Sequence, residues 1–186
     1  LHPEPTEAQI EAGTEVLGEF GADCVVAVGG GSVLDAAKAM RLFHESPDVS
    51  LRELSLPFLD ARKRVAHYPE VEHTVRLLAL PTTAGTGSEV SPATVISAGG
   101  RKVTLVDYSL VPDVAIVDPT LTLTMPPSVT ADTGIDALTH ALEAGVSIFA
   151  SPYTDAFCMQ AINLIMDALP RACENGADLE VRTAMS

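Results

Sequence analysis

The chain has 186 residues, of which 47% are apolar and 19% are charged, so it has enough apolar material for a packed core and is not a disordered chain. Its 25 acidic and 11 basic residues give a formal net charge of −14, whose sign repels phosphate backbones and excludes nucleic acid as an expected partner. Three cysteines without a CxxC spacing fit a reducing, cytoplasmic location, and the longest apolar runs are far too short to cross a membrane.

The first elements along the chain predict half of a βαβ unit. Thr6, followed by Gln9, is typical of a helix start, and Gly21 marks the end of that helix. The valine-rich run 24–28 predicts a strand buried on both faces of a parallel sheet. It leads into a run of three glycines and then a helix over residues 33–43, which completes the strand, turn and helix.

The rest of the chain divides into a mixed part and a helical part. We expect a polar connection with a short helix around residues 54–65. Further along, we expect buried strands at 77–80 and 114–117, and a hairpin of 93–97 with 103–106. After Pro127, apolar residues recur with a helical period over 135–146 and 157–169. These patterns predict α/β structure before a boundary near residues 120–127 and all-α structure after it.

The glycine turn at residues 29–32 is the first candidate binding site. Glycines let a backbone approach a ligand closely, and the free N–H groups of the following helix suit a pyrophosphate. The alternative is a tight turn that binds nothing. The run is also not a GxGxxG sequence, so the ordinary Rossmann fingerprint does not apply. Asp35 and Lys38, one turn apart on the same helix, are typical of a solvated pair.

A second glycine-rich loop follows the strand at 77–80. Its hydroxyl-bearing side chains, next to Gly85 and Gly87, are those of Thr82, Thr83, Thr86 and Ser88. The alternative is a polar loop without a ligand. In open α/β sheets, however, ligands bind beyond the carboxyl ends of the strands, so two such loops favour one shared nucleotide crevice.

Asp136 and His140 are candidate metal ligands. Their spacing places both side chains on one face of a helix, where they can chelate one ion or pair with each other. A carboxylate and an imidazole suit Fe²⁺ or Zn²⁺, although a catalytic metal usually has at least three protein ligands. The alternative is an ordinary solvated pair, but the apolar neighbours Ile135 and Leu142 favour a partly buried one.

Three stretches carry a family resemblance: residues 29–38 (GGGSVLDAAK), 81–89 (PTTAGTGSE) and 134–143 (GIDALTHALE). In this order and spacing they resemble the iron-dependent (group III) alcohol dehydrogenases, and residues 115–143 look like that family's long signature. Residues 58–64, ending near Tyr68, are similar to the alcohol dehydrogenase half of bifunctional aldehyde–alcohol dehydrogenases, with a solvated basic helix face as the alternative.

The resemblance implies a fold and a set of site residues. The fold is a partial Rossmann-like nucleotide-binding α/β domain over residues 1–124, followed by the start of an all-α metal-binding domain over 125–186. It implies two of four ligands for Fe²⁺, or for Zn²⁺ on a related scaffold, and these are Asp136 and His140. For NAD, it implies that Gly30, Gly31 and Ser32 contact the pyrophosphate and that Asp35 lies close to the cofactor. Thr82, Thr83 and Thr86 would line the adenosine and phosphate side, and Val95 and Lys102 would lie near the nicotinamide ribose.

The implied activity is hydride transfer between NAD(H) and a short-chain alcohol or aldehyde, with ethanol and acetaldehyde as the expected pair. Two alternatives stay open: a polyol or glycerol dehydrogenase on the same scaffold, and a non-catalytic nucleotide-binding fragment. The chain opens at Leu1 and closes at Ser186 in a helix-competent stretch without a stop signal. We therefore expect this chain to be a piece of a longer enzyme and to be inactive alone. It contains no obvious proton donor, and we expect the full-length protein to be a homo-oligomer.

Overall fold

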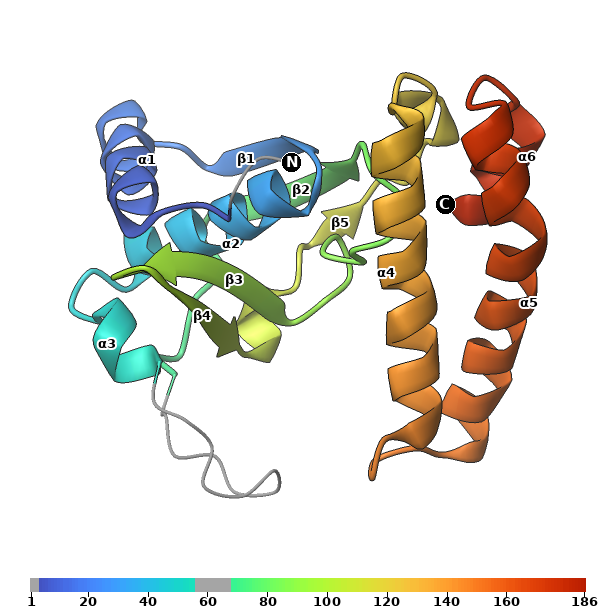
Figure 1. Ribbon diagram of the computed structural model, residues 1–186. Helices are drawn as coiled ribbons and strands as arrows, with labels where there is room; N and C mark the ends of the chain where they lie inside the picture. The colour runs from blue at the N-terminus through green and yellow to red at the C-terminus, as the bar shows by residue number, and fades with distance from the viewer. Residues whose placement is uncertain (1–3, 56–67) are drawn as a thin grey trace. The chain divides into compact units, whose positions relative to one another are not determined.

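The structure is a computed structural model that describes residues 4–55 and 68–186 (Figure 1). The chain divides into two compact units. The first unit contains Leu1–Leu80 and Ser88–Ile116, and the second contains Pro81–Gly87 and Val117–Ser186. Residues 58–64, which resemble the bifunctional enzymes in sequence, lie outside the described residues, as does most of the short helix expected around 54–65.

The first helix of the first unit, α1 (Glu7–Phe20), has the ends that the sequence predicts. The Thr6 hydroxyl accepts a hydrogen bond from the Gln9 N–H, and the Gln9 side chain accepts one from the Thr6 N–H, which forms a capping box. Gly21 ends the helix in the left-handed conformation, with φ at 65°. Of its apolar side chains, Ile10 is buried whereas Phe20 is 84% exposed.

A three-stranded sheet has the order β1 (Cys24–Gly29), β2 (Arg76–Pro81) and β5 (Val114–Ala115). The strands β2 and β5 are parallel, with Leu78 opposite Val114. The helix α2 (Gly31–Glu45) covers one face of this sheet (Figure 1). The core between helix and sheet consists of five buried residues: Ala27, Leu34, Ala37, Leu77 and Ala79.

The expectation that these strands are buried on both faces is wrong in the described structure. Val26 and Val28 are 58% and 52% exposed, and Val114 on the opposite edge strand is 46% exposed. Alternate residues of β1 face α2, while the other face has no covering element among the described residues of the first unit. The third strand is also shorter than the expected 114–117.

The expected hairpin is confirmed as β3 (Ala93–Ala98) and β4 (Arg101–Val106), an antiparallel pair. Gly99 and Gly100, with φ of 57° and 74°, form its two-residue turn, which requires positive φ at both positions. The hairpin packs with α1, α2 and the short α3 (Leu51–Leu54) around a second core, to which Ile10, Leu42 and Ile96 belong. A 3₁₀ turn, η1 (Tyr108–Leu110), leads from β4 to β5.

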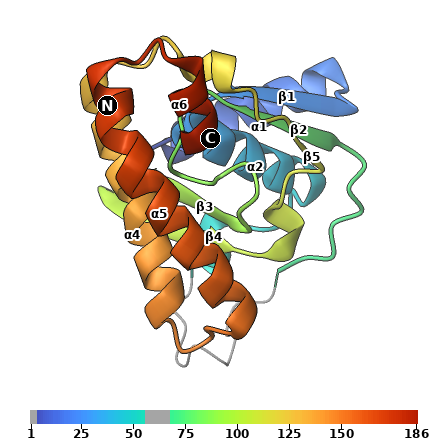
Figure 2. The same cartoon turned by 90° about the vertical axis from the view of Figure 1, so that its right-hand side faces the viewer.

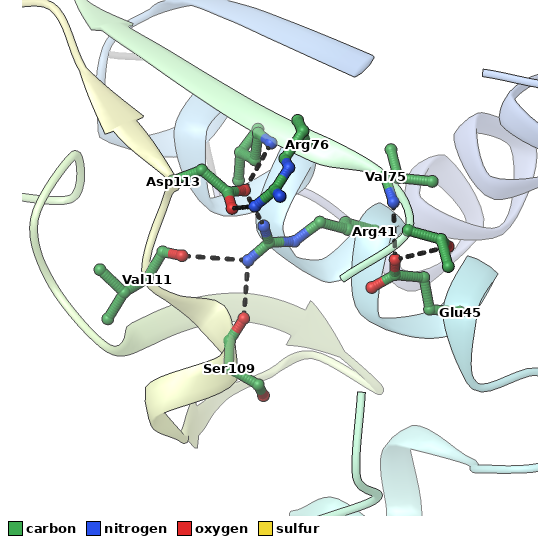
Figure 3. Close-up of polar contacts among 9 residues, drawn as sticks. Arg41, Glu45, Val75, Arg76, Ser109, Val111 and Asp113 are labelled. Atoms are coloured by element: carbon green, nitrogen blue, oxygen red, sulfur yellow. Dashed lines mark hydrogen bonds and ion pairs between the residues drawn. The ribbon is translucent and has the colours of Figure 1, made fainter. Parts of the chain in front are cut away.

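A buried arginine ties α2 to the sheet (Figure 3). Arg41 is 1% exposed, and its guanidinium donates to Asp113 Oδ2 at 2.8 Å and to the carbonyl oxygens of Ser109 and Val111. Asp113 also accepts hydrogen bonds from Arg76 and from the Leu77 N–H. One carboxylate therefore joins α2, the start of β2 and the start of β5.

The second unit contains η2 (Pro119–Thr122), α4 (Pro127–Val146), α5 (Pro152–Glu174) and α6 (Leu179–Met185). Figure 2 shows α4 and α5 as an antiparallel pair. They approach closely at Gly134, where an added Cβ would overlap the Leu169 side chain. The helical period is confirmed, but small residues such as Gly134 and Ala141 form the contact face, whereas Ile135 and Leu142 are 55% and 52% exposed.

Arg182 holds α6 against the beginning of α4. Its buried guanidinium donates to Thr130 Oγ1 at 2.9 Å and to the carbonyl oxygens of Gly176 and Met125. This contact fixes the amino end of α4, the helix that carries both candidate metal ligands. None of the helices in the described part of the chain combines the length and the apolar character needed to cross a membrane.

Candidate functional site

The amino end of α2 is suited to hold an anion. Strand β1 runs to Gly29 and the helix begins at Gly31, so the turn between them is only Gly30. Gly30 is the N-cap and has no side chain that could accept hydrogen bonds from the first N–H groups of the helix. These N–H groups carry the positive end of the dipole of a 15-residue helix. The predicted pyrophosphate site at Gly30, Gly31 and Ser32 therefore has the donors that such a group requires.

The turn is narrow as well as uncapped. A Cβ placed on Gly29 would lie 2.6 Å from Val33 Cβ, so a side chain at Gly29 would displace the first turn of α2. Gly30 differs, because its φ of −76° and ψ of −177° are accessible to any residue. Gly29 is thus required by the fold, whereas the backbone alone does not require a glycine at position 30.

Asp35 lies in the second turn of α2 and binds the segment that leads into β3. Its Oδ1 accepts from Ser88 Oγ at 2.6 Å, and its Oδ2 accepts from the Val95 N–H at 2.9 Å. Its backbone carbonyl accepts from the buried Thr94 hydroxyl. Burial raises the pKa of Asp35, against the lowering effects of the two hydrogen bonds and of the Lys38 charge.

Lys38 is not the solvated partner that the sequence predicts. It is fully buried, and its Nζ donates to the carbonyl oxygens of Ser91 and Ala93 at 2.9 and 2.8 Å. Burial lowers the pKa of Lys38 to about 8, while the charges of Asp35 and Glu89 act in the opposite direction. The correction has a simple physical cause: the hairpin covers this face of α2, and the ammonium group replaces water by backbone carbonyls.

Val95 and Lys102 lie on one face of the hairpin. Val95 is opposite Thr104 and Ser97 is opposite Lys102, so the four side chains share that face. The Lys102 ammonium pairs with Glu4, and the Lys102 side chain is 71% exposed. A hydrogen bond from Lys102 lowers the pKa of Glu4. Of the nine predicted cofactor residues, the structure brings Asp35 and Val95 into direct contact.

The three predicted threonines belong to the second unit, on a loop pressed against α4. A Cβ at Gly85 would overlap the Thr133 carbonyl group, so only glycine allows this approach. Thr83 Oγ1 is buried without a hydrogen-bond partner, which leaves one polar atom of the loop unsatisfied. Thr82 and Thr86 lie in the same loop, on either side of Thr83 and Gly85. Because Gly85 contacts Thr133, the loop lies about one turn before Asp136 on α4.

Asp136 and His140 share one face of α4, with 3.7 Å between Asp136 Oδ1 and His140 Nε2. The His140 and Asp136 side chains are 52% and 46% exposed, so both are more accessible than the apolar neighbours in the sequence suggest. Their donor atoms fit Fe²⁺ or Zn²⁺. Among residues 4–55 and 68–186, no group of three or more His, Cys, Asp or Glu side chains is placed to hold a metal.

Sequence reasoning missed three polar residues that join distant segments: the buried Arg41 and Arg182, and Asp113, which is the partner of Arg41. No local pattern marks them, because Arg41 and Asp113 lie 72 positions apart and Arg182 lies 52 positions from Thr130. It named Ser88 only as one hydroxyl of a polar loop, whereas the structure makes it the partner of Asp35.

Family models match almost the whole chain. Residues 1–119 match the iron-containing alcohol dehydrogenases, and residues 130–186 match the C-terminal part of the Fe-containing alcohol dehydrogenase family.

Curated relatives share between 40% and 49% of their residues with it over the matched segments. An aldehyde-alcohol dehydrogenase of Streptococcus pneumoniae is 49% identical over 100% of the chain and 21% of its own length. The bifunctional aldehyde-alcohol dehydrogenase AdhE of Escherichia coli K12 is 43% identical over 95% of the chain and 20% of its own length. An NADPH-dependent butanol dehydrogenase of Clostridium saccharobutylicum is 40% identical over 100% of the chain and 46% of its own length.

Solved structures share the fold. An iron-containing alcohol dehydrogenase from Thermococcus thioreducens has a TM-score of 0.88 at 39% identity, covering 100% of the chain and 47% of its own. A sulfoacetaldehyde reductase from Bifidobacterium kashiwanohense, in complex with NAD⁺, has a TM-score of 0.85 at 33% identity and the same coverage. A 1,3-propanediol oxidoreductase has a TM-score of 0.87 at 34% identity, covering 100% of the chain and 46% of its own. The chain thus spans about a fifth of the two aldehyde-alcohol dehydrogenases and just under half of these solved relatives.

Proposed function

Because this chain belongs to the iron-containing alcohol dehydrogenase family, we propose that the whole protein transfers a hydride between NAD(H) and a short-chain alcohol or aldehyde. Ethanol and acetaldehyde are the proposed pair, since an aldehyde-alcohol dehydrogenase is 49% identical over the chain. The observation that carries the proposal is the carboxylate and imidazole of Asp136 and His140, 3.7 Å apart on one accessible face of α4.

Asp136 and His140 would hold the metal ion, with further ligands supplied from outside the described residues. When bound, the ion polarises the substrate oxygen and the nicotinamide carries the hydride. The Arg182 contact with Thr130 keeps the amino end of α4 in place, so that the two donor atoms are presented on a rigid helix. The proposed metal is Fe²⁺, with Zn²⁺ as the alternative on a related scaffold.

The cofactor would bind at the amino end of α2. The N–H groups of Gly31 and Ser32 would face the pyrophosphate, and the absence of a side chain at Gly30 would allow close approach. Thr82, Thr83 and Thr86 would contribute hydroxyl groups on the adenosine and phosphate side, and the unsatisfied Thr83 oxygen supports this role. Asp35 would lie close to the cofactor, and Val95 and Lys102 would lie near the nicotinamide ribose.

A second candidate is a diol or polyol dehydrogenase. The resemblance in fold to a 1,3-propanediol oxidoreductase, at a TM-score of 0.87, favours it among the alternatives. The cofactor choice also needs a test, because one relative is an NADPH-dependent butanol dehydrogenase while one solved relative is in complex with NAD⁺.

The test is a side-by-side assay on the whole purified protein, with its metal content measured. Ethanol, 1,3-propanediol and glycerol are offered with NAD or NADP, and acetaldehyde with NADH or NADPH. A kcat/KM that is highest for ethanol with NAD, and one bound metal per chain, is the expected result. Preference for NADP or for a diol would replace the corresponding part of the proposal, and no turnover with any of them would contradict it.

The 186-residue chain alone is proposed to be inactive. Two ligands on the accessible face of a helix leave an ion mostly hydrated, which favours weak, exchangeable binding. Tight stoichiometric metal or ethanol oxidation by this chain alone would contradict that proposal. Cytoplasmic location and a homo-oligomeric whole protein stay predictions.

A further inference from the structure

Both carboxylate oxygens of Asp35 accept hydrogen bonds from other residues of the first unit. One accepts from Ser88 Oγ at 2.6 Å and the other from the Val95 N–H at 2.9 Å. A carboxylate used in this way has less acceptor capacity left for a ribose hydroxyl, and its charge would repel a pyrophosphate. Its contacts instead join the second turn of α2 to the segment that runs from Ser88 into β3.

We propose that Asp35 is a positioning residue that fixes the distance between two parts of the cofactor site, the amino end of α2 and the backbone at Val95. The inference rests on the proposed function, in which the first location holds the pyrophosphate and the second lies by the nicotinamide ribose. A dinucleotide must contact both at once, so a shift between them weakens its binding.

The attachment has a second component on the next turn of the helix. The buried Lys38 ammonium donates to the carbonyl oxygens of Ser91 and Ala93, and Thr94 donates to the Asp35 carbonyl. Lys38 thus holds the middle of the segment, while Asp35 holds both of its ends, at Ser88 and at Val95. Removing the Asp35 carboxylate takes away the contacts to Ser88 and to the Val95 N–H, while the Lys38 and Thr94 contacts and the β3–β4 pairing remain. We therefore expect the segment to shift and the fold to survive.

The experiment compares two ligands on the whole protein by isothermal titration calorimetry. ADP contains the pyrophosphate but no nicotinamide ribose, whereas NAD contains both. Asp35→Ala is expected to raise the Kd for NAD about tenfold, which is roughly 1.4 kcal/mol and the scale of one or two lost hydrogen bonds. The Kd for ADP is expected to change less than about twofold, because ADP contacts only one of the two locations.

Asp35→Asn supplies the rescue. Its amide oxygen can accept from the Val95 N–H, and its amino group can donate to Ser88 Oγ, so both connections persist without the charge. The Kd for NAD is expected to return to within about threefold of the unchanged protein. A variant that binds NAD as weakly as Asp35→Ala would show that the charge itself is needed and would overturn the positioning role.

Glu45→Ala is the matched control. Glu45 lies at the other end of α2 and accepts the same kinds of hydrogen bond, from the Thr74 hydroxyl and the Val75 N–H. It is expected to leave the affinities for both ligands unchanged. Equal weakening of NAD and ADP by Asp35→Ala, or no weakening of either, would overturn the inference. Failure of the unchanged protein to bind either ligand would instead contradict the proposed function.

Discussion

Arg41 and Asp113 form an ion pair in which Nη1 lies 2.8 Å from Oδ2 and the Arg41 side chain is only 2% exposed. The two residues are 72 positions apart, one on α2 and one just before β5. The same carboxylate accepts from Arg76 and the Leu77 N–H (Figure 3). This pair therefore connects the helix that carries the predicted pyrophosphate site to the sheet behind it.

Asp113→Ala should destabilise the first unit by about 3 kcal/mol, because it leaves a buried guanidinium without its counter-charge. The midpoint of urea unfolding measures this loss. The control is Asp167→Ala, which removes an exposed 3.7 Å pair with Arg171 on α5 and should cost less than about 0.5 kcal/mol. Equal effects of the two substitutions would show that burial of Arg41 does not matter.

The same pair should make stability fall in acid. Desolvation raises the pKa of Asp113, but the hydrogen bonds from Leu77 and Arg76 and the Arg41 charge outweigh it and bring the pKa below its ordinary value of 3.8. A carboxyl whose pKa is lower in the folded state contributes stability above its unfolded pKa and loses it as the pH falls through the folded pKa. The difference in unfolding free energy between the unchanged protein and Asp113→Ala should therefore be constant above about pH 5 and shrink below about pH 4. A constant difference down to pH 2 would contradict this.

Gly30→Val should weaken NAD binding without unfolding the protein. The φ and ψ of Gly30 accept a side chain, so the expected damage is to the close approach of the pyrophosphate. We expect the KM for NAD in the whole protein to rise more than about tenfold, with little change in melting temperature. Gly18→Ala on α1 is the control, because only His44 comes within 4 Å of the added carbon; it should leave the KM unchanged. An unchanged KM in Gly30→Val would remove the assignment of the turn.

His140→Ala in the whole protein should abolish both stoichiometric metal and ethanol oxidation, because it removes one of the two donors on α4. Metal content by elemental analysis and initial rates measure the two effects. The control is Asp132→Ala, an exposed carboxylate one turn before Asp136 on the same helix, which should preserve both. Retention of either metal or activity in His140→Ala would reject the ligand role.

Gly85→Ala should displace the threonine loop from α4. The added Cβ would meet the Thr133 backbone, including the carbonyl carbon at 2.7 Å, and a helix backbone cannot yield. We expect a loss of about 3 kcal/mol in unfolding free energy. Gly87→Ala is the control, since open space surrounds it and its φ of 62° should cost only about 1 kcal/mol. A smaller loss at position 85 than at 87 would show that the close approach is not required.

Local signals in the sequence were enough for the elements that depend on neighbouring residues. The Thr6 and Gln9 capping box, the valine-rich strand before the glycine turn and the Gly99-Gly100 hairpin are each specified within a few positions, and the structure confirms them. Their backbone conformations depend on residues that are adjacent in the chain. The motifs of residues 29–38, 81–89 and 134–143 likewise identified the family, which the family models confirm.

Burial and long-range partners were decided only by the tertiary structure. Lys38 follows a solvated pattern in the sequence but is fully buried, because carbonyl oxygens 53 and 55 positions further along surround its ammonium group. Val26 and Ile135 follow buried patterns but are exposed, because one face of the sheet and one face of α4 have no cover within their units among the described residues. Periodicity shows which residues share a face, whereas only the packed elements determine whether that face meets protein or water.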